Sequence, residues 1–327
     1  MMKSFSITNV INPLYTFIAG FLGFFVMFIM FTWNYPLPGD QIGQTFVDTQ
    51  PFLIWKLLLS VFGCLLTILV VPLWGMLAHL LTNRIYESDT SRKRRTLALL
   101  TLQAVFLAIV VLFLDRITSS TQIGFDLNAY VPHGYQTRMA FISIYTFLTA
   151  LPALLGIVLV HRGAQEVLQK IDKAGKTANK LFPLINEILS FRAILQNYLA
   201  ILGLVLSMIP INTAGLRAIL IVLDSNNGQA FPITYPILYG LIFTLILLLL
   251  YIPAHLALSE TSRKLRDCLR PLESLESLKP DLELRQALDE LLQTNIGIIQ
   301  NLKAGLIILA PLLASLVSSL LNVSVSP

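Results

Sequence analysis

Long apolar stretches, separated by short polar segments, dominate the pattern of this chain. A helix needs about 20 mostly apolar residues to cross the hydrocarbon core of a bilayer. The stretches that approach this length are residues 14–33, 52–81, 97–114, 139–160, 198–223, 235–258 and 304–321. The pattern predicts an all-α integral membrane protein with six to seven transmembrane helices. The last stretch is short and carries Pro311, so it could cross the membrane or form a re-entrant helix.

Two polar segments, 161–197 and 259–303, show the alternating three- and four-residue spacing of helices with one apolar face. Each predicts a helical hairpin on the cytoplasmic side, and the two should pack as a coiled-coil-like bundle. We expect the first hairpin to turn near residues 180–183. The second should break at residues 271–280 and return as one unbroken helix over 281–321.

The apolar seam of that returning helix is a candidate surface for packing or assembly. An Asn at a core position of such a seam can fix the register or the number of helices. We therefore keep two interpretations, packing inside the bundle and contact between copies in a homo-oligomer. The seam consists of Leu284, Leu288, Leu291, Asn295, Ile298 and Leu302.

The domain organisation follows from these elements. Residues 1–160 would hold transmembrane helices 1 to 4, and 161–197 the first cytoplasmic hairpin. Residues 198–258 would hold helices 5 and 6, and 259–303 the second hairpin. Residues 304–327 would hold the C-terminal transmembrane or re-entrant helix.

The distribution of Lys and Arg predicts the orientation. The loops 35–51, 117–137 and 224–234 contain neither residue, whereas 83–96 and 161–197 are rich in both. The positive-inside rule then places the N-terminus in the cytoplasm and, if the last helix crosses, the C-terminus outside. We expect a multi-pass protein in a membrane of the bacterial inner type.

The composition limits the classes of partner. Only 13% of the residues are charged and 55% are hydrophobic, against about 25% charged in soluble domains. The net charge of +5 therefore predicts contact with anionic lipids at the inner face rather than with nucleic acid, because no basic patch carries interleaved aromatic residues.

Motifs for catalysis do not appear in the sequence. It contains no phosphate-binding loop, no nucleophile elbow of the form Gly-x-Ser-x-Gly and no His-Glu-x-x-His. Cys64 and Cys268 form neither a disulfide framework nor a metal site. We therefore expect neither an enzyme nor a bound cofactor, although an intramembrane enzyme acting on lipid could lack such motifs.

Basic residues near the outer ends of the spans are candidates for a transport pathway. Lys56, Arg116 and Arg138 could form a vestibule that attracts anions, or they could reach to lipid headgroups. Arg217 lies deeper and follows Asn212 and Thr213. The segment 210–215 predicts a break in the fifth span, which could line a pathway or be an ordinary proline kink.

These features favour a channel-like or transport protein. The most specific version of this hypothesis is an anion-selective oligomer. The alternative is a membrane-anchored scaffold or effector whose cytoplasmic helical bundle binds a partner protein.

Overall fold

The computed structural model describes residues 13–33, 35–85, 101, 130–174, 178–224, 231–270, 278–292 and 298–323. Within these residues the structure is helical and contains no strand, as predicted from the apolar pattern. Its elements are α1 (Pro13–Met30), α2 (Gln41–Val47), α3 (Gln50–Ile85), α5 (Tyr135–Ala174), α6 (Ala178–Leu223), α8 (Thr234–Leu269), α9 (Leu278–Leu291) and α10 (Ile298–Val323).

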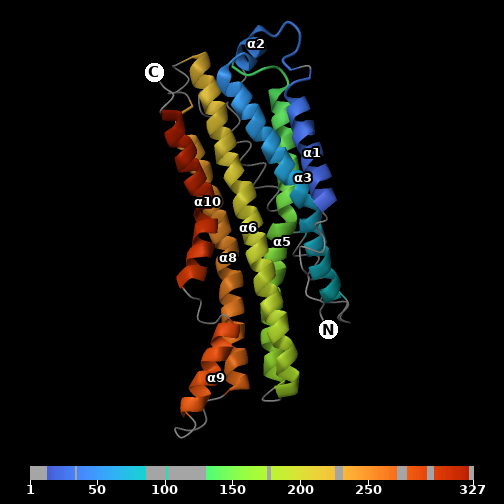
Figure 1. The fold of residues 1–327 in the computed structure, drawn as a ribbon, viewed down its shortest axis with the longest axis vertical. Coiled ribbons are helices and arrows are strands. Elements are labelled where there is room, and N and C mark those ends of the chain that lie inside the picture. Colours follow the sequence, from blue (N-terminus) through green and yellow to red (C-terminus); the bar gives the residue numbers. More distant parts are fainter. Residues whose placement is uncertain are drawn as a thin grey trace.

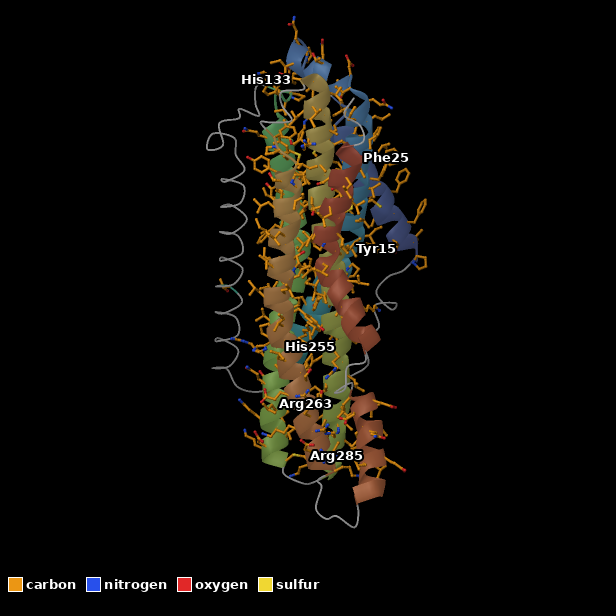
Figure 2. All side chains as sticks on the ribbon, turned by 90° about the vertical axis from the view of Figure 1, so that its left-hand side faces the viewer. Tyr15, Phe25, His133, His255, Arg263 and Arg285 are labelled. Atoms are coloured by element: carbon orange, nitrogen blue, oxygen red, sulfur yellow. The ribbon has the colours of Figure 1, made fainter. Side chains whose placement is uncertain are left out.

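The long helices form an elongated bundle around α6 (Figure 1). Helix α6 packs against α3, α5, α8 and α10, while α1 packs on α3. The short helix α2 covers one end of the bundle and α9 lies at the other. We call these the α2 end and the α9 end. Figure 2 places His133 at the α2 end, Arg285 at the α9 end and His255 between them.

Six helices in the described part are long and apolar enough to cross a membrane: α1, α3, α5, α6, α8 and α10. They correspond to six of the apolar stretches found in the sequence and are compatible with a multi-pass membrane protein. The stretch 97–114, together with Arg116, lies outside the described residues. Helix α6 has 46 residues and is therefore roughly 70 Å long, more than twice the ~30 Å hydrocarbon core. Any bilayer leaves part of the bundle protruding.

The structure differs from the pattern predicted by the sequence in three places. Helix α6 continues without interruption through both Pro183 and Pro210, so the fifth span is not broken. Helix α6 already begins at Ala178, so residues 180–183, where the first hairpin was expected to turn, lie inside this helix. The expected helix over 281–321 is divided, because α9 ends at Leu291 and α10 begins at Ile298.

Glycines allow several helix pairs to approach closely. A Cβ atom on Gly23 of α1 would lie 2.5 Å from the carbonyl oxygen of Gly63 on α3. A Cβ atom on Gly240 of α8 would lie 2.7 Å from the carbonyl oxygen of Pro311 on α10. Small residues at contacts are typical of helices that associate in lipid, where burial of apolar surface supplies no driving force.

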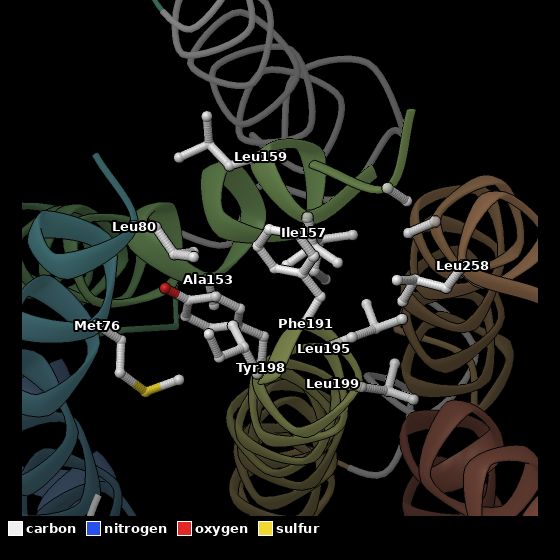
Figure 3. Close-up of a cluster of buried hydrophobic side chains, with 14 of the residues drawn as sticks. Met76, Leu80, Ala153, Ile157, Leu159, Phe191, Leu195, Tyr198, Leu199 and Leu258 are labelled. Atoms are coloured by element: carbon white, nitrogen blue, oxygen red, sulfur yellow. The ribbon is translucent and has the colours of Figure 1, made fainter. Parts of the chain in front are cut away.

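The centre of the bundle is an apolar cluster contributed by α3, α5, α6 and α8 (Figure 3). Tyr198 of α6 is fully buried there and lies over Gly156 of α5. Ile157, Phe191 and Leu195 surround it. This filled core fixes α5, α6 and α8 relative to one another along the middle of the bundle.

Candidate functional site

An aromatic cluster closes the α2 end of the bundle. Trp55, which is 1% exposed, lies at its centre, with the ring of Phe31 at 5.3 Å and that of Tyr135 at 6.2 Å. The indole Nε1 of Trp55 donates a hydrogen bond to the backbone oxygen of Asn212 at 3.0 Å. This bond joins α3 to α6 in the segment where the sequence predicted a break.

Asn212 and Thr213 bond back to their own helix. The amide nitrogen of Asn212 donates to the carbonyl of Met208 at 2.7 Å, and the Thr213 hydroxyl donates to the carbonyl of Ile209 at 3.0 Å. Both side chains therefore bond to carbonyls one turn earlier in their own helix.

Lys56 of α3 and Arg138 of α5 both contact the C-terminal end of α1 or the residues just after it. The Arg138 guanidinium donates to the carbonyl of Met30, the last residue of α1, and lies 4.0 Å from the ring centroid of Tyr35. The Lys56 ammonium lies 4.4 Å from the ring centroid of Phe28 and 3.5 Å from the hydroxyl of Thr32. Cations are favourable at a helix C-terminus because of the helix dipole.

Arg217 makes a separate contact at the α2 end. Its Nε donates to the carbonyl of Phe231 at 3.0 Å, which ties α6 to the segment preceding α8. Each described member of the predicted basic set thus has its own local contact. A shallow pocket beside Arg138 measures about 420 Å³ and is lined by Ile29, Met30, Trp33 and Arg138.

Asp40 links the two described loops at the α2 end. Its carboxylate accepts hydrogen bonds from the backbone N–H of Gly43 at 2.9 Å and of His133 at 2.8 Å. Burial alone would raise the pKa of the Asp40 carboxyl, but these hydrogen bonds and the His133 ring hold the pKa below its ordinary value. The negative charge of Asp40 therefore stabilises this loop contact.

Polar contacts also join α5, α6 and α8 between the middle of the bundle and the α9 end. Arg192 of α6 is 8% exposed and donates to the hydroxyl of Ser262 on α8 at 3.1 Å. The hydroxyl of Thr261 donates to the carbonyl of Ala164 on α5 at 3.1 Å. These contacts fix the register of α5, α6 and α8 where the helices become polar.

Ion pairs hold the α9 end together. Arg266 of α8 lies 2.8 Å from Asp289 of α9, and Arg285 of α9 pairs with Asp267 of α8. Between α5 and α6, the Lys170 ammonium lies 3.3 Å from the Glu187 carboxylate. The two pairs between α8 and α9 attach α9 to the bundle through charged side chains.

The face of α9 that packs on the bundle differs from the predicted seam by one residue. Asp289 and Leu292 are buried, whereas Leu284 and Leu291 are 44% and 50% exposed. The interpretation of the seam as packing inside the chain is therefore wrong for Leu284 and Leu291. Leu288 is partly covered, Asn295 lies outside the described residues, and Ile298 and Leu302 belong to α10.

The buried Arg192 and the central position of Trp55 were not predicted from the sequence. An Arg beside an apolar seam was a usable signal for the first, because burying a charge in a helix bundle requires specific partners. Nothing local in the sequence pairs Trp55 with residue 212.

Among the described residues no group of His, Cys, Asp or Glu could hold a metal ion. No known protein family, curated protein or solved structure matches this chain.

Proposed function

We propose that this chain is a multi-pass membrane protein that acts as an anchored scaffold or effector, with the α9 end as a cytoplasmic platform for a partner protein. The carrying observation is the row of Leu284 and Leu291, exposed on a helix whose other face is fixed to the bundle by ion pairs. An exposed apolar row outside the candidate spans, on a helix fixed to the bundle, is typical of a surface that binds another protein.

The distribution of charge supports this orientation. The α9 end carries exposed Lys173, Lys180 and Arg263, together with the paired Lys170, Arg266 and Arg285. The described loops of the α2 end, residues 35–49 and 130–134, contain no Lys or Arg. By the positive-inside rule the α9 end faces the cytoplasm and the α2 end faces outward. The N-terminus is then cytoplasmic, and α10 carries the C-terminus outward.

The side chains exposed on α9 indicate which kind of partner it could bind. Glu283 and Glu290 are exposed beside the leucine row. An acidic helix with an apolar row suits a partner helix that carries leucine-type anchors flanked by Lys or Arg. A second copy of the chain is the other occupant that this surface could take.

Photo-cross-linking in intact cells tests the platform. A cross-linking amino acid at position 284 should give an adduct of one defined mass, whereas the same group at Gln286, exposed on another side of α9, should give none. Leu291→Glu should abolish the adduct at 284. An adduct of twice the chain mass would identify a homo-oligomer and replace the partner-docking proposal. Equal labelling at 284 and 286 would contradict a defined docking face.

An oligomeric channel or transporter is the second candidate. It is favoured by the half-buried polar residues Ser207, Thr213 and Arg217 of α6, which lie within a candidate span. Charged and polar groups in such a span often mark a pathway. The basic residues of the α2 end are engaged in local contacts, so a pathway would form between copies rather than through one chain.

Planar-bilayer recording tests this second candidate. Discrete conductance steps whose reversal potential shifts on Arg217→Glu would support an anion-selective pathway. A silent bilayer with folded protein, or identical selectivity for Arg217→Glu and the wild type, would remove Arg217 from any such role.

A further inference from the structure

The pocket at the α2 end has the composition of a lipid headgroup site. It joins three apolar side chains of α1 and its C-terminal segment, Ile29, Met30 and Trp33, to the guanidinium of Arg138 on α5. Trp33 is 77% exposed at the rim. A cation next to exposed Trp is the usual chemistry of the boundary between headgroups and hydrocarbon.

An exposed row of large side chains leads along α1 to this pocket. Phe17, Phe21 and Phe25 are spaced four residues apart, and Ile29 and Trp33 continue the spacing. All five are more than 40% exposed. The rings of Phe21 and Phe25 lie 4.3 Å apart, and Figure 2 shows Phe25 pointing away from the bundle. The row belongs to a wider exposed apolar face of α1 that also includes Ile18, Leu22 and Val26.

We infer that this pocket and row bind one anionic phospholipid of the outer leaflet, with its phosphate at Arg138 and an acyl chain along the phenylalanine row. Guanidinium binds phosphate through charge-assisted hydrogen bonds, which are stronger than neutral ones. The row adds apolar contact that a soluble phosphate cannot use. The arrangement would fasten α1, which packs mainly on α3, to the rest of the bundle.

Native mass spectrometry of the full chain in detergent, with phosphatidylglycerol added, tests this inference. The wild type should retain one lipid per chain. Arg138→Gln should lower the retained fraction about tenfold, from the loss of one charged hydrogen bond. Lys56→Gln is the matched control: it removes a cation at the same end that does not line the pocket, and it should leave retention unchanged.

Arg138 also contacts the end of α1, so its replacement could disturb the fold. A second variant therefore separates loss of binding from misfolding. Ile29→Trp fills the pocket and leaves Arg138 in place, so it should lower retention with an unchanged thermal midpoint. An excess of inorganic phosphate or glycerol phosphate should not displace the lipid. Retention that is equal in the wild type, Arg138→Gln and Ile29→Trp would overturn the inference. Displacement by inorganic phosphate would also overturn it, since the site would then be a simple anion site.

Discussion

The indole N–H of Trp55 on α3 is hydrogen-bonded to the backbone oxygen of Asn212 on α6, at 3.0 Å. The ring also covers Gly215, where an added Cβ would lie 2.7 Å from it. One side chain of α3 thus braces α6 just beyond Pro210.

Trp55→Phe should destabilise the protein by about 2 kcal/mol, from one lost hydrogen bond and a small packing defect. Thermal unfolding in detergent measures the loss. Trp74→Phe on the same helix is the control, because Trp74 is 43% exposed and should change stability by less than about 0.5 kcal/mol. Equal losses in the two variants would contradict the bracing role of Trp55.

Gly156→Ala should destabilise the bundle by about 2 kcal/mol, because the new methyl group would lie 2.1 Å from a ring carbon of Tyr198. Tyr198→Leu combined with Gly156→Ala should cost less than the sum of the single changes. At Gly305 of α10 no atom lies within 4 Å of an added Cβ, so Gly305→Ala should be neutral or stabilising. Additive costs at 156 and 198 would refute the contact.

The Asp40 contact predicts a pH dependence with a definite sign. Hydrogen bonds lower the pKa of Asp40 in the folded state below its ordinary value of 3.8. The charge therefore contributes stability above the ordinary value, and this contribution is lost as pH falls through the folded-state pKa. The difference in thermal midpoint between wild type and Asp40→Asn should shrink as pH falls below about 4, where the carboxylate of the wild type is neutralised. A difference that grows as pH falls below about 4 would contradict this assignment.

Arg266→Gln should release α9. Asp289 is largely buried and would lose its cationic partner, at a cost of about 2 kcal/mol, so amide hydrogen exchange in α9 should accelerate more than tenfold. Lys264→Gln removes a pair with Asp172 whose side chains are 42% and 54% exposed, and should have little effect. If both variants left α9 equally protected, ion pairing would not be what holds it.

The helical class and most spans could be predicted because a run of about 20 apolar residues is typical of a helix that crosses a membrane. The break at Pro210 was predicted wrongly. A proline removes only one backbone donor, and a helix packed against its neighbours can continue through it, as α6 does beside α3.

The register of α9 could not be predicted for a similar reason. Apolar periodicity assigns Leu284 and Leu291 to the packed face and Asp289 to solvent. In the structure the Arg266–Asp289 pair turns the helix so that Asp289 is buried. A pairing between residues 23 positions apart leaves no trace in the local pattern. The sequence also predicted that Lys56, Arg138 and Arg217 lie near one end of the bundle. It could not predict which groups they contact, because those groups come from other segments of the chain.

Both proposals depend on the orientation of the bundle, with the α2 end outside and the α9 end in the cytoplasm. Cysteine labelling of intact cells tests this orientation, using full chains in which Cys64 and Cys268 are replaced by Ala. His133 and Gln286 are exposed positions near the two ends. With a membrane-impermeant maleimide, His133→Cys should label in intact cells and Gln286→Cys only after permeabilisation. Labelling of Gln286→Cys in intact cells, with His133→Cys protected, would invert the bundle and contradict the account.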